Sequence, residues 1–368
     1  MDFRLQPSLQ HMAAFRTALH LYFDSEIQNM LDDIEIHGTV GTFDRVRNEH
    51  WKMTENLAME KLHSLPKLLR TRVAKLIQPI QIEIRLWERD HRFIDDQDEE
   101  IPLKSLFCWK PDGTIDHEQT AKTFVQNEKM DLKIRFIMAC TYFMEKEIFY
   151  LWHRIKETGK ICKSRLAINS AVRFWLYYIQ DEVKEPWSEM IGDYYKTPDI
   201  RRKDLPIRMS SIFRFLSEEK KQFYLTTFGY KMYNDDFLGC LRQMDRKAQV
   251  KLFESQSGGV LLRLLKWPYQ TLFIEIAKTL WCHMSISSFE AVLSRIIFHC
   301  ILKGFRYFDY VQLFREFWQL SPASFQEEMR KDKKFFDVIE ATLNCSSESC
   351  SEEVEQCLEE AIKKFIAL

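Results

Sequence analysis

WCHMSISSFEAVL, residues 281–293, is followed 36 positions later by FWQLSPASFQEEM, residues 317–329, with a similar order of residue types. An apolar segment with helical spacing precedes each copy. The paired positions are Leu272 and Phe308, Ile274 and Tyr310, Ala277 and Leu313, Trp281 and Phe317, Met284 and Leu320, Ser285 and Ser321, Ser288 and Ser324, and Phe289 and Phe325. Each copy therefore indicates a helix, a Ser-rich turn and a second helix. This period lies in the range of two-helix repeats such as tetratricopeptide, ankyrin and HEAT units, which bury their apolar faces by stacking.

The composition favours the same fold class. A chain of 368 residues with 10 Gly and 10 Pro has few of the residues that break helices and form tight turns. We therefore expect an all-α protein, an irregular α-solenoid of antiparallel helical hairpins of the ankyrin, HEAT or tetratricopeptide kind. The expected organisation is a helical N-terminal region over 1–100, a helical-hairpin repeat array over 101–343, and a polar linker with a capping amphipathic helix over 344–368.

Aromatic residues make up 14% of the chain. Packing between helix layers accounts for this abundance, because aromatic side chains dominate the energetics of cores. Stacking on bases or prolines is the alternative. Trp281 and Phe317 each close the first helix of their copy, so we expect both to occupy the same kind of buried slot between neighbouring helices.

The charge and cysteine patterns restrict the partners and the compartment. The 53 basic and 54 acidic residues nearly cancel, so no overall field attracts nucleic acid or an anionic membrane. No run reaches the roughly 18 consecutive apolar residues of a membrane-spanning helix. Cys140, Cys240, Cys282 and Cys300 lie in apolar helical runs, a pattern typical of reduced, buried thiols. Because the N-terminus also lacks the pattern of a signal peptide, we expect a cytoplasmic protein.

Local patterns predict where several elements begin and end. Apolar residues at three- and four-residue steps predict a helix over 8–32, and Ser64 is expected to cap another helix. The residues 111–113, Pro-Asp-Gly, predict a turn, and Asp116 with Gln119 predicts a capping box.

The segment WKPDGTID, residues 109–116, precedes RFIMACTYFMEKEIFYLW, residues 135–152. This part of the chain resembles the uncharacterised α-helical-repeat proteins present in many copies in spiders, in which a similar RF-AC-Y-E-I-LW string recurs. It is also similar to the two-helix half of an ankyrin repeat, although the T-P-L-H turn signature of that family is absent. The resemblance covers residues 100–160 directly and implies a helical stack. It carries over no catalytic residue and no partner.

The sequence shows no pattern typical of a catalytic, cofactor-binding or metal-binding site. The phosphate-binding GxxxxGK[ST] and GxGxxG loops, the GxSxG elbow, HExxH and CxxC are absent, and Gly258-Gly259 alone predicts a turn. Cys282-His283 and His299-Cys300 come closest to a metal-ligand set. If residues 287–300 form one helix, a rise of about 1.5 Å per residue separates the two pairs by roughly 20 Å, too far to share an ion.

Other charged groups have a simpler interpretation than catalysis or binding. Asp235-Asp236 and Glu218-Glu219 are candidates for a general acid and base, but we expect both pairs to lie on solvated helix faces. The basic run Arg201-Arg202-Lys203 is a candidate for phosphate contact, with a solvated loop as the alternative. Ser349 is expected to cap a helix, with phosphorylation as the alternative.

These observations favour a non-enzymatic protein–protein interaction scaffold, with a protein partner and no cofactor. One alternative is a ubiquitin-ligase substrate adaptor, because SLPKLLRTRVAKLI, residues 64–77, resembles an F-box. The resemblance implies that Leu65, Pro66, Leu68, Leu69, Val73 and Ile77 dock the ligase adaptor subunit. A second alternative is an enzyme of unknown class, which would require buried His and carboxylate side chains that lie close together.

Overall fold

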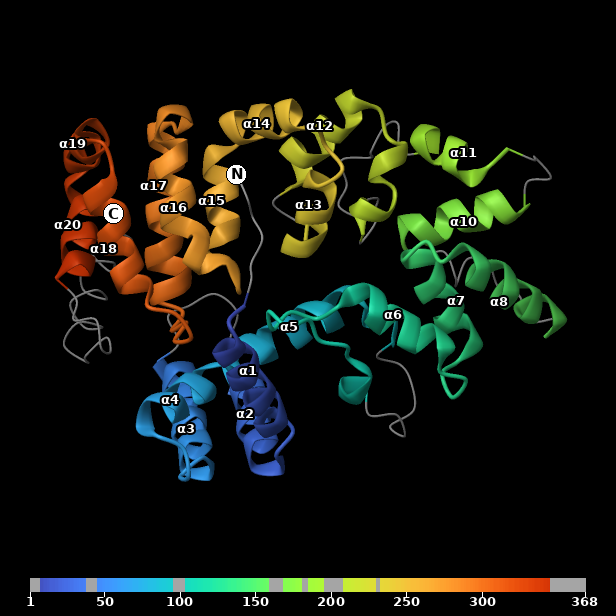
Figure 1. Cartoon of the computed structure of the whole chain (residues 1–368), viewed down its shortest axis with the longest axis horizontal. Coiled ribbons are helices and arrows are strands. Elements are labelled where there is room, and N and C mark those ends of the chain that lie inside the picture. Colours follow the sequence, from blue (N-terminus) through green and yellow to red (C-terminus); the bar gives the residue numbers. More distant parts are fainter. Residues whose placement is uncertain are drawn as a thin grey trace. The chain divides into compact units, whose positions relative to one another are not determined.

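A computed structural model describes residues 7–37, 45–94, 103–158, 168–180, 185–194, 208–229 and 232–344. Within these ranges the regular elements are helices (Figure 1), and β pairing is limited to an isolated antiparallel bridge between Trp109 and Ile115. The all-α prediction is therefore confirmed for this part of the chain. No helix in these ranges is long and apolar enough to cross a membrane. The linker and amphipathic helix predicted from residue 344 onward lie outside the described residues, apart from Asn344 itself.

Contacts divide the chain into two compact units that alternate along the sequence. Unit 1 comprises Met1–Ile82, Pro111–Gly113 and Phe253–Leu368, and unit 2 comprises Glu83–Lys110 and Thr114–Leu252. A grouping by compactness does not test where a repeat array begins or ends. The boundaries expected at residues 100 and 343 therefore stay predictions.

Unit 1 is built from helices near both ends of the chain. They are α1 (Leu9–Tyr22), α2 (Ser25–His37), α3 (Arg45–Lys61), α4 (Lys67–Lys75), the start of α5 (Ile77–Asp90), the end of α14 (Arg246–Ser255), α15 (Ser257–Leu264), η6 (Tyr269–Leu272), α16 (Phe273–Leu280), η7 (Trp281–His283), α17 (Ile286–Ile296), the π-helical η8 (Ile297–Ile301), α18 (Tyr310–Leu320), α19 (Ala323–Lys331) and α20 (Lys333–Leu343). Arg306 links the C-terminal helices of unit 1 to its N-terminal helices. Its Nε lies 2.9 Å from Glu55 Oε1 of α3, and its backbone N–H donates to Gln78 Oε1 of α5 at 2.9 Å.

Two predictions about the N-terminal helices are wrong in detail. The helix expected over 8–32 is interrupted between α1 and α2, because the Asp24 carboxylate accepts the backbone N–H of Glu26 at 3.0 Å and begins a new helix. The expected cap at Ser64 is replaced by Pro66, which precedes α4 and provides no side-chain hydrogen bond. Proline suits this position because its ring holds φ near the helical value and the first helical turn needs no N–H from it.

In the C-terminal part of unit 1, the helices that occupy equivalent positions in the two similar stretches of sequence contact each other. Helix α16 contacts α18, α17 contacts α19, and α18 contacts α20. Phe317 of α18 is fully buried, with its ring centroid 5.1 Å from that of Phe273 and 5.3 Å from that of Phe289. Trp281 departs from the expectation of a buried slot like that of Phe317. It lies in η7, is half-buried, and stacks directly on Phe317 at 5.0 Å.

Gly258 and Gly259 form no turn, which corrects the prediction made for them. They lie in the first turn of α15, which packs against α17. A Cβ atom on Gly258 would lie 2.7 Å from Ser288 Cβ, closer than non-bonded carbon atoms are found in proteins. The glycine therefore permits a close approach of two helices rather than a change of chain direction.

Unit 2 consists of the middle of the chain. Its helices are the end of α5, η1 (Arg92–Ile94), η2 (Leu103–Leu106), α6 (His117–Gln126), α7 (Leu132–Thr141), α8 (Glu145–Glu157), α10 (Ser170–Gln180), α11 (Trp187–Tyr194), η3 (Met209–Ser211), η4 (Phe213–Phe215), α12 (Glu218–Phe228), α13 (Asn234–Leu241) and the start of α14. Asp116 caps α6, with its carboxylate accepting the Gln119 N–H at 3.1 Å. The predicted capping box is only half formed, because the Asp116 N–H donates to the Cys108 carbonyl at 2.7 Å and not to the Gln119 side chain.

Candidate functional site

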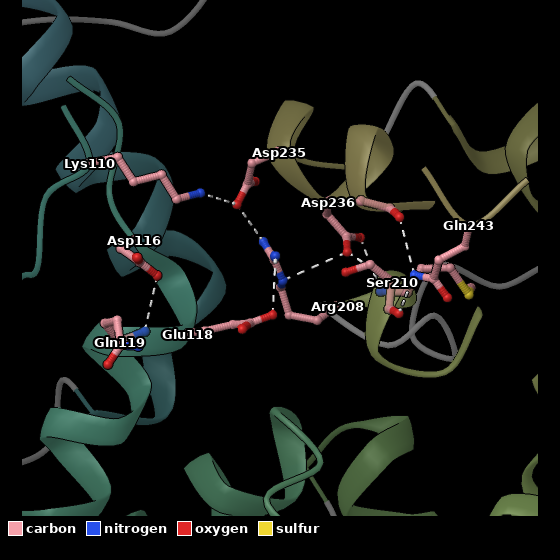
Figure 2. A network of polar contacts seen from close by, with 11 residues as sticks. Lys110, Asp116, Glu118, Gln119, Arg208, Ser210, Asp235, Asp236 and Gln243 are labelled. Atoms are coloured by element: carbon pink, nitrogen blue, oxygen red, sulfur yellow. Dashed lines mark hydrogen bonds and ion pairs between the residues drawn. The ribbon is translucent and has the colours of Figure 1, made fainter. Parts of the chain in front are cut away.

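Unit 2 contains a largely buried group of ionisable side chains that we name the charge cluster, comprising Lys110, His117, Arg208, Asp235 and Asp236. Figure 2 shows Lys110, Arg208, Asp235 and Asp236 of this cluster. Asp235 and Asp236 lie in the first turn of α13, where a carboxylate is favoured by the helix dipole. Arg208 immediately precedes η3, and its Nη1 lies 2.8 Å from Asp235 Oδ2. Lys110 Nζ lies 3.1 Å from the same oxygen. Asp235 thus joins two cations that are far apart in the sequence.

Asp236 points toward η3. Its carboxylate accepts the backbone N–H of Met209 at 3.0 Å and that of Ser210 at 2.9 Å. Its Oδ1 also lies 3.7 Å from Arg208 Nε. Two adjacent helical residues on different sides of α13 therefore hold one short segment, Asp235 through a side chain and Asp236 through the backbone.

The burial of Asp236 contradicts the sequence-based expectation of a solvated face. Its exposed fraction is 0%, and the Asp235 side chain is 16% exposed. Glu218 and Glu219, by contrast, are exposed as expected. The sequence offered a weak indication, because Phe237 and Cys240 follow at positions that are also buried. No pattern in the sequence indicated that Arg208 would pair with these two carboxylates.

Burial and ion pairing act in opposite directions on the two carboxylates. Burial by itself raises the pKa of Asp235, but the Arg208 guanidinium, the His117 ring and the Lys110 ammonium outweigh it and leave the pKa well below the usual range. At Asp236, by contrast, burial dominates, and the pKa of this carboxyl is raised despite the nearby Arg208. Burial lowers the pKa of Arg208, but Asp235 and Asp236 more than compensate, so its pKa is raised and the guanidinium stays charged.

Two neutral histidines lie beside these charges. His117, the first residue of α6, is 3% exposed, its ring centroid lies 4.3 Å from that of Tyr233, and its Nδ1 has no hydrogen-bond partner. Burial lowers the pKa of His117 to about 3, with Arg208 and Lys110 adding repulsion. His91 donates from Nδ1 to the Trp87 carbonyl at 2.7 Å, so its Nε2 accepts from the Tyr142 hydroxyl at 3.0 Å. Burial lowers the pKa of His91 to about 4.

The charge cluster brings together the residue types that an enzyme would require, but not in a reactive form. A general base works best when its pKa is near the working pH, and the pKa of His117 lies far below that range. The carboxylates of Asp235 and Asp236 are already occupied by cations or backbone N–H groups. The arrangement is therefore suited to holding η3, α13 and residue 110 together.

The two Cys-His pairs considered for metal binding form no metal site in the described part of the chain. Among the described residues, no group of three or more His, Cys, Asp or Glu side chains could hold a metal ion. Cys300 is buried in η8, as are Cys140 and Cys240 elsewhere, but Cys282 is exposed in η7, which corrects the expectation that it is buried. Arg201-Arg202-Lys203 and Ser349 lie outside the described residues.

The F-box-like segment uses much of its apolar face internally. Val73 and Ile77 are 3% and 1% exposed within unit 1, whereas Leu68 is 80% exposed. Docking of a ligase adaptor in the F-box manner would need Val73 and Ile77 at the surface. This burial does not favour the adaptor alternative.

Unit 2 also carries a continuous group of aromatic rings that we name the aromatic cluster. Its members are Phe143, Phe149, Phe174, Trp175, Tyr178, Trp187, Tyr194 and Phe215. Phe174 and Trp175 of α10 are fully buried at its base, while Phe149 of α8 is 43% exposed and Tyr194 of α11 is 38% exposed. Trp187 is half-buried between Trp175, at 5.3 Å, and Phe215, at 5.1 Å.

One member of the aromatic cluster, Phe143, has a strained backbone conformation. Phe143 follows Tyr142, the C-cap of α7, and has φ 53°, the left-handed conformation that usually selects glycine after a helix. A bulky residue in this conformation costs on the order of 1–3 kcal/mol, which surrounding contacts must offset. The Phe143 ring packs against Phe174, Trp175 and Trp187, with centroids 5.9–6.3 Å apart. Sequence reasoning assigned such aromatics to the core and gave no signal that some form a surface.

A scan against protein-family models, a search of curated proteins and a search of solved structures each find no match to this chain. The side chains themselves must therefore support any inference about function.

Proposed function

We propose that the protein is a non-enzymatic scaffold that binds a protein partner through the exposed edge of the aromatic cluster. The observation that supports this proposal is the partial exposure of Phe149 and Tyr194, which belong to the same aromatic cluster as half-buried Trp187. Tyr, Trp and Arg are enriched among the residues that contribute most to protein–protein binding. The exposed Arg214 guanidinium, 4.6 Å from the Phe215 ring centroid, adds the third of these residue types.

The rigidity of the aromatic cluster also supports binding. Exposed rings that are already held by neighbouring rings lose little conformational freedom when a partner covers them, so less of the interaction energy is spent on ordering. Phe149 contacts Trp175 and Tyr178, and Tyr194 contacts Phe174, with ring centroids 5.2–6.4 Å apart. We propose that the partner is a protein and that the binding takes place in the cytoplasm.

The finer architecture belongs to the same proposal. We infer that the C-terminal helices of unit 1 are irregular repeats of an α-solenoid, with α16 and α17 as one hairpin and α18 and α19 as the next. Contacts between α16 and α18 and between α17 and α19 support this inference, because equivalent helices of consecutive repeats stack on each other.

Affinity purification with quantitative mass spectrometry tests the binding proposal. The wild-type chain is compared with Phe149→Ala and Tyr194→Ala, and with Phe223→Ala as a matched control. Phe223 lies on α12 of unit 2, is 42% exposed and is outside the aromatic cluster. We expect a partner recovered by the wild type and by Phe223→Ala to be reduced by roughly 10-fold or more with Phe149→Ala or Tyr194→Ala, as for a binding hot spot.

Equal recovery of every partner by all four proteins would show that the aromatic cluster is not the binding surface. Thermal unfolding of each variant serves as a control, since a loss of binding counts only where the melting temperature stays close to that of the wild type.

A further inference from the structure

We propose that the charge cluster is a pH-responsive latch. Mildly acidic solution raises the population of a transiently opened state, in which the start of α6 is released from α13 and η3, because only that state takes up a proton on His117. This inference concerns the internal attachment of unit 2 and is independent of the proposed partner binding. It rests on the position of one buried imidazole, on the charges that face it, and on the segments that those charges join.

The position of His117 is unfavourable for a positive charge in three ways. The ring is buried against Tyr233, so a charged imidazolium would lose its hydration. Its Nδ1 has no acceptor, so an added N–H there would also be unpaired. His117 is the first residue of α6, where the positive end of the helix dipole adds further repulsion.

The charges around His117 are already matched without it. Asp235 of α13 is the anion that attracts it, but this carboxylate is shared by Arg208 at 2.8 Å and Lys110 at 3.1 Å. Arg208, Lys110 and His91 all disfavour a charge on His117. Glu118 on α6 lies 3.9 Å from Arg208, and its side chain is 58% exposed. A third cation therefore has no free anion within the charge cluster.

When the start of α6 separates from α13, water can reach His117 and hydrate its positive charge. Asp235 and Asp236 join the first turn of α13 to Arg208 and η3. The start of α6 meets these segments through the ring contact of His117 with Tyr233 and through Glu118, which lies 3.9 Å from Arg208. Separating α6 from α13 exposes His117 while leaving the cores of the helices intact. His91, also buried and neutral, contributes to the same acid sensitivity through its contact with Tyr142 of the α7 end.

The size of the effect follows from proton linkage. The pKa of His117 is lowered from 6.5 to about 3, so at pH 5.0 an opened state binds a proton that the closed state excludes. The closed state is fully favoured above the ordinary pKa and is progressively lost as the pH falls below it. Between pH 7.5 and pH 5.0 the opening equilibrium shifts by about 30-fold for one such histidine.

Hydrogen exchange measured by mass spectrometry at pH 7.5 and pH 5.0, corrected for intrinsic exchange rates, tests the latch. In the wild type we expect peptides from α6 and α13 to gain exchange at pH 5.0 by about 30-fold or more in opening equilibrium. In His117→Gln, which cannot be protonated, this gain should shrink by about 30-fold. His153→Gln is the control, because His153 is on α8 of the same unit and its side chain is 76% exposed.

Equal acid-induced opening of α6 and α13 in the wild type and in His117→Gln would overturn the proposal. A second measurement needs no variant. In the nuclear magnetic resonance titration of the folded wild-type chain, the His117 ring signals should stay those of the neutral form down to pH 5.0. A titration of His117 with a pKa near its ordinary value would equally overturn the proposal.

Discussion

Removal of Arg208 is the perturbation whose consequences the structure defines most fully. Its guanidinium lies 2.8 Å from Asp235 and 3.7 Å from Asp236, and its side chain is 6% exposed. Arg208→Met keeps much of the side-chain volume but leaves two buried carboxylates, of which Asp235 retains Lys110 and Asp236 retains two backbone N–H donors. Removing one partner of a buried ion pair costs roughly 3–5 kcal/mol, because the remaining charge loses its compensation.

That cost is a large part of the stability of an ordinary domain, which is about 5–15 kcal/mol. Urea unfolding followed by far-ultraviolet circular dichroism should therefore show a clearly lower midpoint for Arg208→Met. Asp235→Asn and the double variant Arg208→Met/Asp235→Asn complete a double-mutant cycle. We expect the double variant to lose less than the sum of the single losses, by about 0.5–3 kcal/mol.

The pH dependence gives the same reasoning a second test. Burial raises the pKa of Asp235, but Arg208 and the other cations lower it further than burial raises it. A lowered pKa adds stability above the ordinary value of 3.8, and that stability is lost as the pH falls through the folded-state pKa. The difference between the wild type and Arg208→Met should therefore be largest near neutral pH and shrink in strong acid. Strict additivity in the cycle, with no change in this difference, would refute the account of the charge cluster.

Four further substitutions test packing in unit 1. Phe317→Ala should lower stability by roughly 3–5 kcal/mol, because it removes a fully buried ring, and Trp281→Ala should cost less because Trp281 is half-buried; the order of their melting temperatures checks this. Gly258→Ala should destabilise by more than the usual helix propensity would predict, because its Cβ would lie 2.7 Å from Ser288 Cβ, and urea unfolding would detect the loss. Gly113→Ala should lower the melting temperature, because Gly113 has φ 93° and a Cβ there would approach Phe15 and Trp267 at 3.0 Å; an unchanged melting temperature would contradict the reasoning for either glycine.

Several local features were predictable because they depend on neighbours in the sequence. The Asp116 cap of α6 and the turn at Gly113 follow from short-range hydrogen bonds and backbone preferences. The interruption at Asp24 was missed because the apolar spacing continues across it, while the carboxylate competes for the backbone N–H groups.

The candidate sites could not be predicted in the same way. Asp235 and Asp236 look like a solvated acidic pair until Arg208 and Lys110 are brought beside Asp235, and Lys110 is distant from it in the sequence. The exposed rings of the aromatic cluster have the same residue types as the buried rings, so composition does not separate Phe149 from Phe174.

The sequence by itself determined the fold class, since helical spacing, capping residues and scarce Gly and Pro act over one or two turns of chain. Tertiary structure decided which polar residues are buried, which rings are exposed, and that Glu55 and Gln78 meet Arg306. The physical reason is that burial and ion pairing depend on which distant segments come together. No local preference of a side chain specifies that choice.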